Sequence, residues 1–327
     1  MNLGRPDSPK RFDRVAGAVS YAAMSVVEPI DLAQSPPAQS SLARPAGFEV
    51  RRAALDGAPP PTPVIFASPH SGRLYPDDMM AAAALDARAI RRSEDAFVDQ
   101  LVELAPSVGA ALIMARYARA YIDVNRDAFE LDPAMFADPL PNFARSRTAR
   151  VAAGLGAIAK VVSEGQEIYA HKLTFAEAQA RIDLVHRPYH QALAQLIAEA
   201  KAAHGLAILV DWHSMPSLAA RSAGLACDMV LGDRFGAACS ETLTRMVETE
   251  LEGRGYRVVR NTPYAGGYTT EHYGRPAGRV HALQIELNRA LYLDEEALSP
   301  SADFARLKKD LEQVTRALVT ADWTSLR

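Results

Sequence analysis

The chain has 327 residues, a formal net charge of −3 and a hydrophobic content of 49%. This length and composition predict a large buried core, and the near balance of charge argues against nucleic acid or an anionic membrane as a partner. No apolar stretch is long enough for a transmembrane helix, and none is convincing as a secretory signal. The two cysteines exclude both a disulfide framework and a zinc site built from thiolates. We therefore expect a cytoplasmic protein.

The N-terminal part predicts a tail followed by a strand and a helix. Residues 1–45 are rich in Pro, Ser, Ala and Arg without a steady period, which predicts a flexible tail ahead of one ordered domain over residues 46–327. The apolar run 64–67 predicts a buried strand that leads into Ser68-Pro69-His70-Ser71-Gly72. With Asp86 as its N-cap, a helix is expected from there to about residue 104.

The middle of the chain predicts short strands, a long loop and a long helix. Strands are expected at 110–114 and 120–124, and the second leads into Asp123-Val124-Asn125-Arg126. A loop is expected over 131–142, and its length is typical of functional or mobile loops. Residues 175–203 read as helical, with a kink or break at Pro188.

The C-terminal part continues the alternation of strands and helices. The apolar run 206–210 predicts a buried strand that leads into Asp211-Trp212-His213-Ser214-Met215. Further strands are expected at 229–233, 256–259 and 281–287, and helices at about 236–251 and 300–318. This alternation predicts the α/β class, with helices on both faces of the sheet.

Two of the predicted strands lead into a His-Ser pair, at His70 and His213. In open α/β sheets, ligands collect at the carboxyl ends of the strands. Two strand-end histidines therefore suggest a divalent metal site, with zinc the first expectation. A catalytic zinc often takes two histidines and one carboxylate, and either Glu94 or Asp95, on the helix after His70, could be the third ligand. The alternative is that both histidines are ordinary core or loop residues.

Glu286 lies among apolar neighbours on the last predicted strand. A buried carboxylate is costly unless it is paired or functional, and loss of solvation would raise its pKa and suit it to act as a general base. The alternative is a structural ion pair with Arg289 or another arginine.

Several polar residues could bind a substrate. The amide of Asn125 and the guanidinium of Arg126, with that of Arg119 just upstream, could donate hydrogen bonds to a free carboxylate of a substrate. The alternative is that these residues belong to a solvated loop without a binding role. His272 and Arg275, in a loop rich in glycine and tyrosine, are expected to form a mobile rim over the site. The remaining histidines in helical or loop surroundings receive no role; they are His171, His186, His190 and His204.

Taken together, these motifs resemble the N-formylglutamate amidohydrolase family. The matching pieces keep the family's order over roughly residues 62 to 295. They are the motif 68–72 with Tyr75-Pro76, Asp95 with Val98-Asp99, Arg119 through 123–126, Pro188-Tyr189-His190, 211–215, 266–274 and Ile285-Glu286-Leu287. Any one of them is weak evidence, but the ordered set is specific.

The resemblance implies a single α/β domain with a mixed, mostly parallel sheet, similar in fold to zinc carboxypeptidases and aspartoacylase-type deacylases. It implies one zinc ion held by His70, His213 and Asp95, which matches the family's pattern better than Glu94. Zinc carboxypeptidases instead place a glutamate three residues after the first histidine, where this sequence has Arg73.

The resemblance also implies the roles of the other site residues. Glu286 matches the catalytic glutamate and Arg119 the arginine that polarises the scissile carbonyl. Asn125 and Arg126 match the motif that binds the substrate carboxylate, and His272 and Arg275 complete the predicted substrate-binding set.

The function implied by this resemblance is that of a zinc-dependent amidohydrolase that cleaves N-formyl-L-glutamate to formate and L-glutamate, a step of histidine degradation. In this hypothesis Glu286 removes a proton from a zinc-activated water. Two alternatives stay open: a deacylase of another N-acyl amino acid or related amide, and a binding module without turnover. The sequence determines neither the oligomeric state nor the choice among zinc, cobalt and manganese.

Overall fold

The computed structural model describes residues 1, 44–53, 60–162, 165–222 and 226–326. The chain divides into two units, Met1–Arg44 and Pro45–Arg327, and every described helix and strand belongs to the second unit. The tail predicted for residues 1–45 lies almost wholly outside the described residues and stays a prediction.

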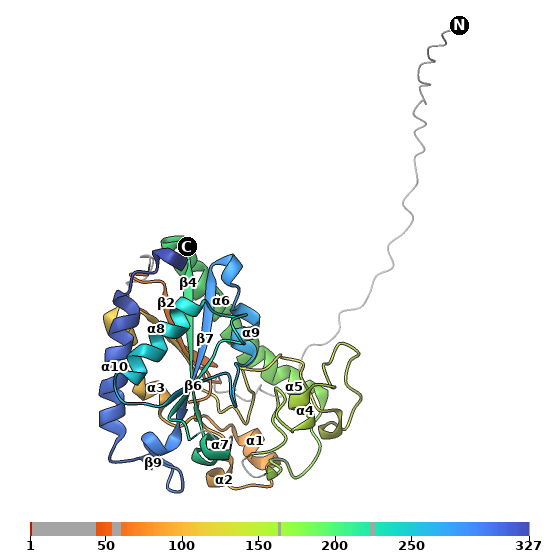
Figure 1. The fold of residues 1–327 in the computed structure, drawn as a ribbon. Coiled ribbons are helices and arrows are strands. Elements are labelled where there is room, and N and C mark those ends of the chain that lie inside the picture. Colours follow the sequence, from red (N-terminus) through yellow and green to blue (C-terminus); the bar gives the residue numbers. More distant parts are fainter. Residues whose placement is uncertain (2–43, 54–59, 163–164, 223–225, 327) are drawn as a thin grey trace, which may run out of the picture. The chain divides into compact units, whose positions relative to one another are not determined.

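In the part of the chain that the structure describes, seven strands form one sheet in the order β1-β3-β2-β4-β7-β5-β6 (Figure 1). The strands are Phe48–Arg51 (β1), Val64–Ser68 (β2), Ala111–Ala115 (β3), Ala207–Met215 (β4), Met229–Gly232 (β5), Val258–Arg260 (β6) and Val280–Asn288 (β7). β3, β2, β4 and β7 are parallel, whereas β1 is antiparallel to β3 and β5 is antiparallel to β7. This mixed, mostly parallel sheet in one α/β domain confirms the predicted fold class.

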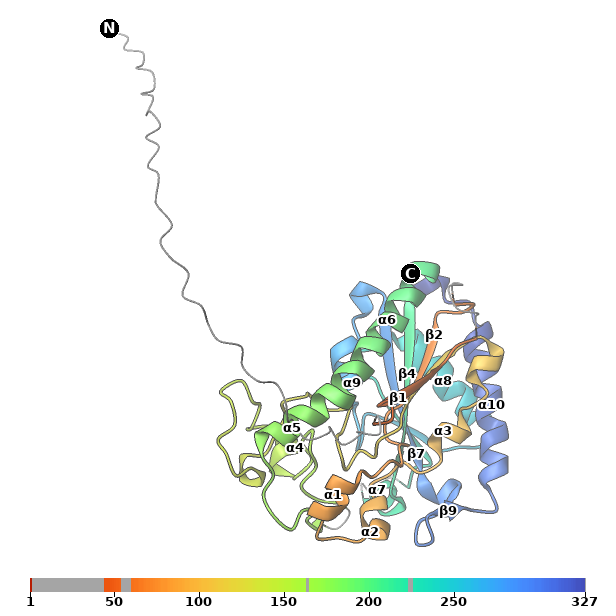
Figure 2. The same ribbon diagram turned by 180° about the vertical axis from the view of Figure 1, so that it is seen from behind.

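Helices cover both faces of the sheet (Figures 1 and 2). They are Asp77–Ala82 (α1), Ala87–Arg91 (α2), Val98–Leu101 (α3), Ala149–Ala152 (α4), Phe175–Arg181 (α5), Arg187–His204 (α6), Ser217–Ser222 (α7), Glu241–Glu252 (α8), Tyr268–Tyr273 (α9) and Phe304–Thr320 (α10). α3, α8 and α10 pack on one face, and α6 packs against β2, β3 and β4 on the other. A short two-stranded sheet, Leu293–Asp294 (β8) with Ser299–Pro300 (β9), lies before α10.

The two central strands alternate between the two faces, residue by residue. Phe66 of β2 and Val210 of β4 belong to the core beneath α3, α8 and α10. Ile65 and Leu209 belong to the core beneath α6. Because side chains of a strand point alternately to opposite faces, a strand buried on both faces is apolar along its whole length, which is why both runs were recognisable in the sequence.

Two predicted elements are wrong. The helix expected over 86–104 is instead α2 and α3 with a break between them, although Asp86 does cap α2 by accepting a hydrogen bond from the Ala89 N–H. Phe97 has φ of 63°, a left-handed conformation that a continuous helix excludes. The strand expected over 120–124 is a buried turn, in which Tyr121 N–H bonds to Ala118 O and the Asp123 N–H bonds to Ala157 O.

The predicted helix over 175–203 is confirmed. A capping box between Thr174 and Glu177 starts α5, and a π-helical segment, Ile182–His186, connects α5 to α6 immediately before Pro188. Because proline cannot donate a backbone hydrogen bond, the hydrogen-bond pattern changes from α-helical to π-helical before Pro188, and the chain remains helical. The helices expected at 236 and 300 begin later, at Glu241 and Phe304.

No helix among the described residues is long and apolar enough to cross a membrane. Cys227 and Cys239 are buried free thiols. The expected cytoplasmic location stays a prediction.

Candidate metal centre

The sheet brings His70 and His213 to the same edge. β2 and β4 are parallel neighbours with Ala67 paired to Asp211, so the loop after β2 and the end of β4 lie side by side. Along one face of β4 the side chains change from apolar, at Leu209, to polar, at Asp211 and His213. The third residue is Asp95, whose N–H donates to the backbone carbonyl of His70 at 3.0 Å.

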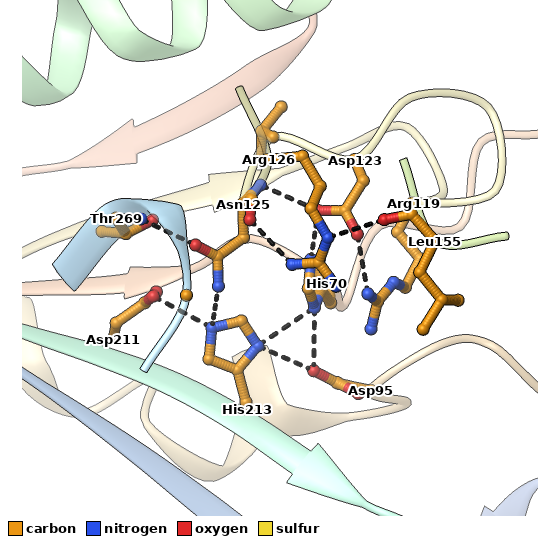
Figure 3. A network of polar contacts seen from close by, with 12 residues as sticks. His70, Asp95, Arg119, Asp123, Asn125, Arg126, Leu155, Asp211, His213 and Thr269 are labelled. Atoms are coloured by element: carbon orange, nitrogen blue, oxygen red, sulfur yellow. Dashed lines mark hydrogen bonds and ion pairs between the residues drawn. The ribbon is translucent and has the colours of Figure 1, made fainter. Parts of the chain in front are cut away.

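His70, Asp95 and His213 form a buried cluster that could hold a metal ion (Figure 3). The two Nδ1 atoms are 3.0 Å apart, and Oδ2 of Asp95 lies 3.3 Å from Nδ1 of His70 and 3.1 Å from Nδ1 of His213. Ligands at about 2.0–2.1 Å around a tetrahedral zinc ion are separated by about 3.3 Å. The three atoms therefore have the spacing that a single ion requires.

The other ring nitrogen of each histidine faces a second carboxylate. Nε2 of His70 lies 2.7 Å from Oδ1 of Asp123, at hydrogen-bond distance. Nε2 of His213 lies 3.0 Å from Oδ2 of Asp211, but this contact is an ion pair that lacks the alignment of a hydrogen bond. For His70, the carboxylate of Asp123 holds the hydrogen on Nε2 and leaves the Nδ1 lone pair for a metal, whereas Nε2 of His213 lies between Asp211 and Nδ2 of Asn125. This donor set fits a divalent ion.

The electrostatics of the cluster favour a positive charge at its centre. Burial by itself would raise the pKa of Asp95, but hydrogen bonds and charge from His213 and His70 hold this pKa well below its ordinary value. Burial would lower the pKa of His213, but the charge of Asp211 raises it well above its ordinary value. A proton or a metal ion is thus stabilised at the same place.

The structure brings Asp95, and not Glu94, into the cluster. The carboxylate of Glu94 accepts hydrogen bonds from the Tyr75 hydroxyl at 2.6 Å and from Nε of Arg91 at 3.1 Å. These two hydrogen bonds hold the carboxylate of Glu94 away from the two histidines.

The cluster opens into a cavity of about 500 Å³. Its charged lining residues are the arginines Arg92, Arg119, Arg126, Arg150 and Arg289 and the carboxylates Asp95, Asp123 and Glu286. With the histidines neutral, the five arginines exceed the three carboxylates by two positive charges. A cavity of this kind attracts an anionic substrate.

Glu286 pairs in register with His213 across β4 and β7, so it lies beside the cluster. Its Oε1 accepts a hydrogen bond from Nε2 of Gln284 at 2.8 Å. Burial raises the pKa of Glu286 to about 7, against the charge of His213, which lowers it. Arg289, the alternative partner for Glu286, instead donates to Ser214, to the carbonyl of Arg92 and to Asp95. Glu286 therefore has the placement and the pKa of a general base near neutral pH.

Arg119, predicted to be catalytic, and the predicted substrate-binding residues Asn125 and Arg126 also line the cavity. Arg119 donates to Oδ2 of Asp123 at 2.7 Å, and Arg126 donates through Nε to Leu155 O and through Nη1 to Asn125 O. Asn125 accepts from the Thr269 N–H, and its Nδ2 lies 3.0 Å from Nε2 of His213. This leaves at most the second amide hydrogen of Asn125 free for a substrate.

His272 and Arg275 are not brought into the cavity. His272 is exposed and stacks on Tyr268 with ring centroids 5.0 Å apart. Arg275 is exposed and donates to the backbone carbonyls of Glu271 and Gly274. Neither is among the lining residues of the described cavity.

Two residues near the site were missed by the sequence reasoning. Nε2 of His186 lies 2.9 Å from Arg126 O, and Nε2 of His190 lies 2.8 Å from Val124 O, so the two imidazoles hold the carbonyls on either side of Asn125. Burial lowers the pKa of both, to about 3 for His190, which keeps both rings neutral. Their spacing of four residues, one helical turn, was the available signal.

Comparisons with known proteins agree with one another. The model of the family described as N-formylglutamate amidohydrolase matches residues 62–293. N-formylglutamate deformylase of Pseudomonas aeruginosa is 31% identical over 261 residues, which cover 79% of this chain and 90% of that protein. The deformylase of the same name from Pseudomonas putida is 29% identical over 263 residues, covering 79% and 92%. The crystal structure of N-formylglutamate amidohydrolase from Ralstonia eutropha superposes with a TM-score of 0.78 at 37% identity, covering 84% of this chain and 97% of that one.

Proposed function

The chain belongs to the N-formylglutamate amidohydrolase family, and from that premise we propose that it is a metal-dependent hydrolase that converts N-formyl-L-glutamate and water to formate and L-glutamate. The observation that carries the proposal is the pairing of two features at one sheet edge. The cluster of His70, Asp95 and His213 has the spacing of a metal site, and Glu286 lies beside it with a pKa near neutrality. The surplus of positive charge around the cavity, to which a bound metal ion would add, favours a substrate that carries carboxylates.

A divalent metal held by His70, Asp95 and His213, with zinc the first candidate, would supply a Lewis acid that polarises the formyl oxygen and acidifies water. Glu286 takes a proton from the attacking water as its oxygen bonds to the formyl carbon. The guanidinium of Arg119 stabilises the negative charge that develops on the former carbonyl oxygen. Glu286 then passes the proton to the departing nitrogen, and the C–N bond breaks.

The remaining residues hold the substrate and the site in place. The spare nitrogen of Arg126 and the second amide hydrogen of Asn125 are available to a substrate carboxylate. Gln284 links the base to the glycine-rich loop, because its Nε2 donates to Glu286 and its Oε1 accepts from the Gly267 N–H at 2.7 Å. Such positioning fixes the angle of attack.

The test is formate release from N-formyl-L-glutamate by purified protein, before and after a chelator and again after metal is added back. Release that the chelator abolishes and zinc restores supports the proposal. Protein that contains metal but releases no formate contradicts the choice of substrate, and a panel of other N-acyl amino acids is then the next measurement. Release that survives complete removal of metal contradicts the metal-dependent mechanism.

A further inference from the structure

The five arginines of the cavity differ in how many of their nitrogens are already used. Arg289 uses Nε, Nη1 and Nη2 for bonds to Ser214, to the Arg92 carbonyl and to Asp95. Arg126 uses Nε and Nη1 on two backbone carbonyls, and Arg119 uses Nη2 on Asp123. These three guanidinium groups are therefore partly or fully committed to holding the protein itself.

Arg150 is different. Within the described residues its side chain makes no hydrogen bond, and its ion pair with Oε2 of Glu130 spans 3.7 Å. Glu130 is meanwhile bonded to the hydroxyl of Thr148. The side chain of Arg150 is 30% exposed, so its planar fork is available in the cavity wall. A free guanidinium fork is the group that binds a carboxylate through two parallel hydrogen bonds.

Arg150 lies on the same wall as Arg126. The N–H of Leu155 donates to the carbonyl of Arg150 at 2.8 Å, and the carbonyl of Leu155 accepts from Nε of Arg126 at 2.9 Å. One residue thus connects the backbone of α4 to the Arg126 guanidinium. Burial lowers the pKa of Arg126, and the charge of Arg150 acts on it in the same direction, which agrees with this proximity.

We propose that Arg150 binds the side-chain carboxylate of the glutamate moiety and thereby makes the enzyme select dicarboxylate substrates. This inference rests on the proposed function, because it takes Arg126 and Asn125 to hold the other carboxylate. Two carboxylates separated by a few bonds need two cationic groups on one wall, and Arg126 and Arg150 are such a pair. Arg92 also lines the cavity, and within the described residues its side chain makes no hydrogen bond or ion pair. Its backbone carbonyl, however, accepts from Nη1 of Arg289, whose other nitrogens bond to Ser214 and Asp95, so Arg92 lies on the side of the metal cluster and not on the wall of Arg126.

The test compares N-formyl-L-glutamate with N-formyl-L-glutamine, which has the same shape and no side-chain charge. A hydrogen bond to a charged group is worth about 10- to 100-fold in binding. We expect the wild type to favour the glutamate compound by about that factor in kcat/KM. Arg150→Gln should remove most of this preference by raising KM for the glutamate compound, and leave the rate on the glutamine compound within about twofold.

Arg145→Gln is the matched control. Arg145 is an exposed arginine on the same segment that pairs with Asp127 at 3.2 Å and does not line the cavity, so its loss should leave the preference unchanged. Equal losses on both substrates in Arg150→Gln would show that the residue acts only through Glu130, and the proposal falls. An unchanged preference in Arg150→Gln, or loss of the preference in Arg92→Gln instead, also overturns it.

A binding measurement separates this inference from the proposed function. Calorimetry with L-glutamate and L-glutamine requires no turnover. If the metal-loaded wild type binds glutamate more tightly and Arg150→Gln does not, the carboxylate site stands even when no formate is released. If the wild type binds both amino acids equally or neither, the carboxylate site is refuted whatever the turnover.

Discussion

Replacing Glu286 by glutamine tests the role of this residue most directly. Glutamine has the same shape, and its carbonyl oxygen can still accept the hydrogen bond from Gln284. It cannot accept a proton from water. Since Glu286 is not among the three candidate ligands, the variant should keep its metal and lose turnover.

The structure also indicates the size of the loss. A positioned general base contributes about 10²- to 10⁴-fold. Two other carboxylates line the described cavity, Asp95 in the metal cluster and Asp123 bonded to His70 and Arg119. Neither is free to replace Glu286 as a base. We therefore expect the loss in kcat to lie in the upper part of that range, about 10³- to 10⁴-fold.

The assay is formate release at saturating substrate, together with metal analysis of the same protein. Glu94→Gln is the matched control, because Glu94 is also a buried glutamate, and its partners, Tyr75 and Arg91, lie outside the cavity. It should keep both metal and turnover. Normal turnover by Glu286→Gln with a full complement of metal would refute the assignment of the base.

The same variant makes a prediction about stability. The pKa of Glu286 in the metal-free fold is raised to about 7, so ionising this group within the fold is unfavourable. That destabilisation is fully present above pH 7 and disappears below the ordinary range of a carboxyl group. Metal-free Glu286→Gln should therefore melt at a higher temperature than the metal-free wild type at pH 8, and at about the same temperature at pH 4. A lower melting temperature at pH 8 would contradict the raised pKa.

Three further results are expected from the metal cluster and its surroundings. Asp95→Asn should lose metal on desalting, whereas Glu94→Gln should retain it; retention of metal by Asp95→Asn would exclude Asp95 as a ligand. Metal binding to the metal-free protein near pH 7 should release a proton, because the raised pKa of His213 keeps this side chain protonated until the ion displaces the proton. The calorimetric enthalpy of metal binding should then depend on the ionisation enthalpy of the buffer. A binding enthalpy that is the same in every buffer would contradict the release of a proton. His190→Ala should lower kcat/KM by up to about 100-fold with metal retained, because it releases the Val124 carbonyl next to Asn125; an unchanged kcat/KM would show that the loop needs no such support.

The central strands and the histidines at their ends could be predicted because their signals are local. A strand buried on both faces must be apolar throughout, as at Ile65 and Leu209, and a polar residue at its carboxyl end is then conspicuous. His70 and His213 stand at such ends, and parallel pairing of neighbouring strands brings them together. Glu286 was recognisable for the same reason, as a carboxylate in an otherwise apolar strand.

The errors arose where tertiary contacts override local pattern. Residues 86–104 have helical spacing, but the backbone of Asp95 bonds to the His70 carbonyl, and the chain turns sharply at Phe97. A continuous helix could not make that bond, so the placement of Asp95 requires the break. Residues 120–124 are apolar except for Asp123 because they form a buried turn against Ala157, and apolarity alone does not distinguish a buried turn from a strand.

The arginines show why the substrate-binding side of the site is harder to predict than the metal side. A metal ligand is identified by its residue type and its place in the fold, whereas an arginine is available to a substrate only if nothing in the protein already uses its nitrogens. Arg126 and Arg150 look equivalent in the sequence, yet Arg126 donates to the carbonyls of Leu155 and Asn125, whereas the only contact of the Arg150 guanidinium within the described residues is a 3.7 Å ion pair with Glu130. That difference depends on the carbonyl of Leu155, which the loop after α4 brings close to Arg126, and on the carbonyl of the preceding residue, Asn125. If it governs selectivity, substitution at Arg150 alters the choice of substrate, while substitution at Arg126 also disturbs the loop and lowers activity on every substrate.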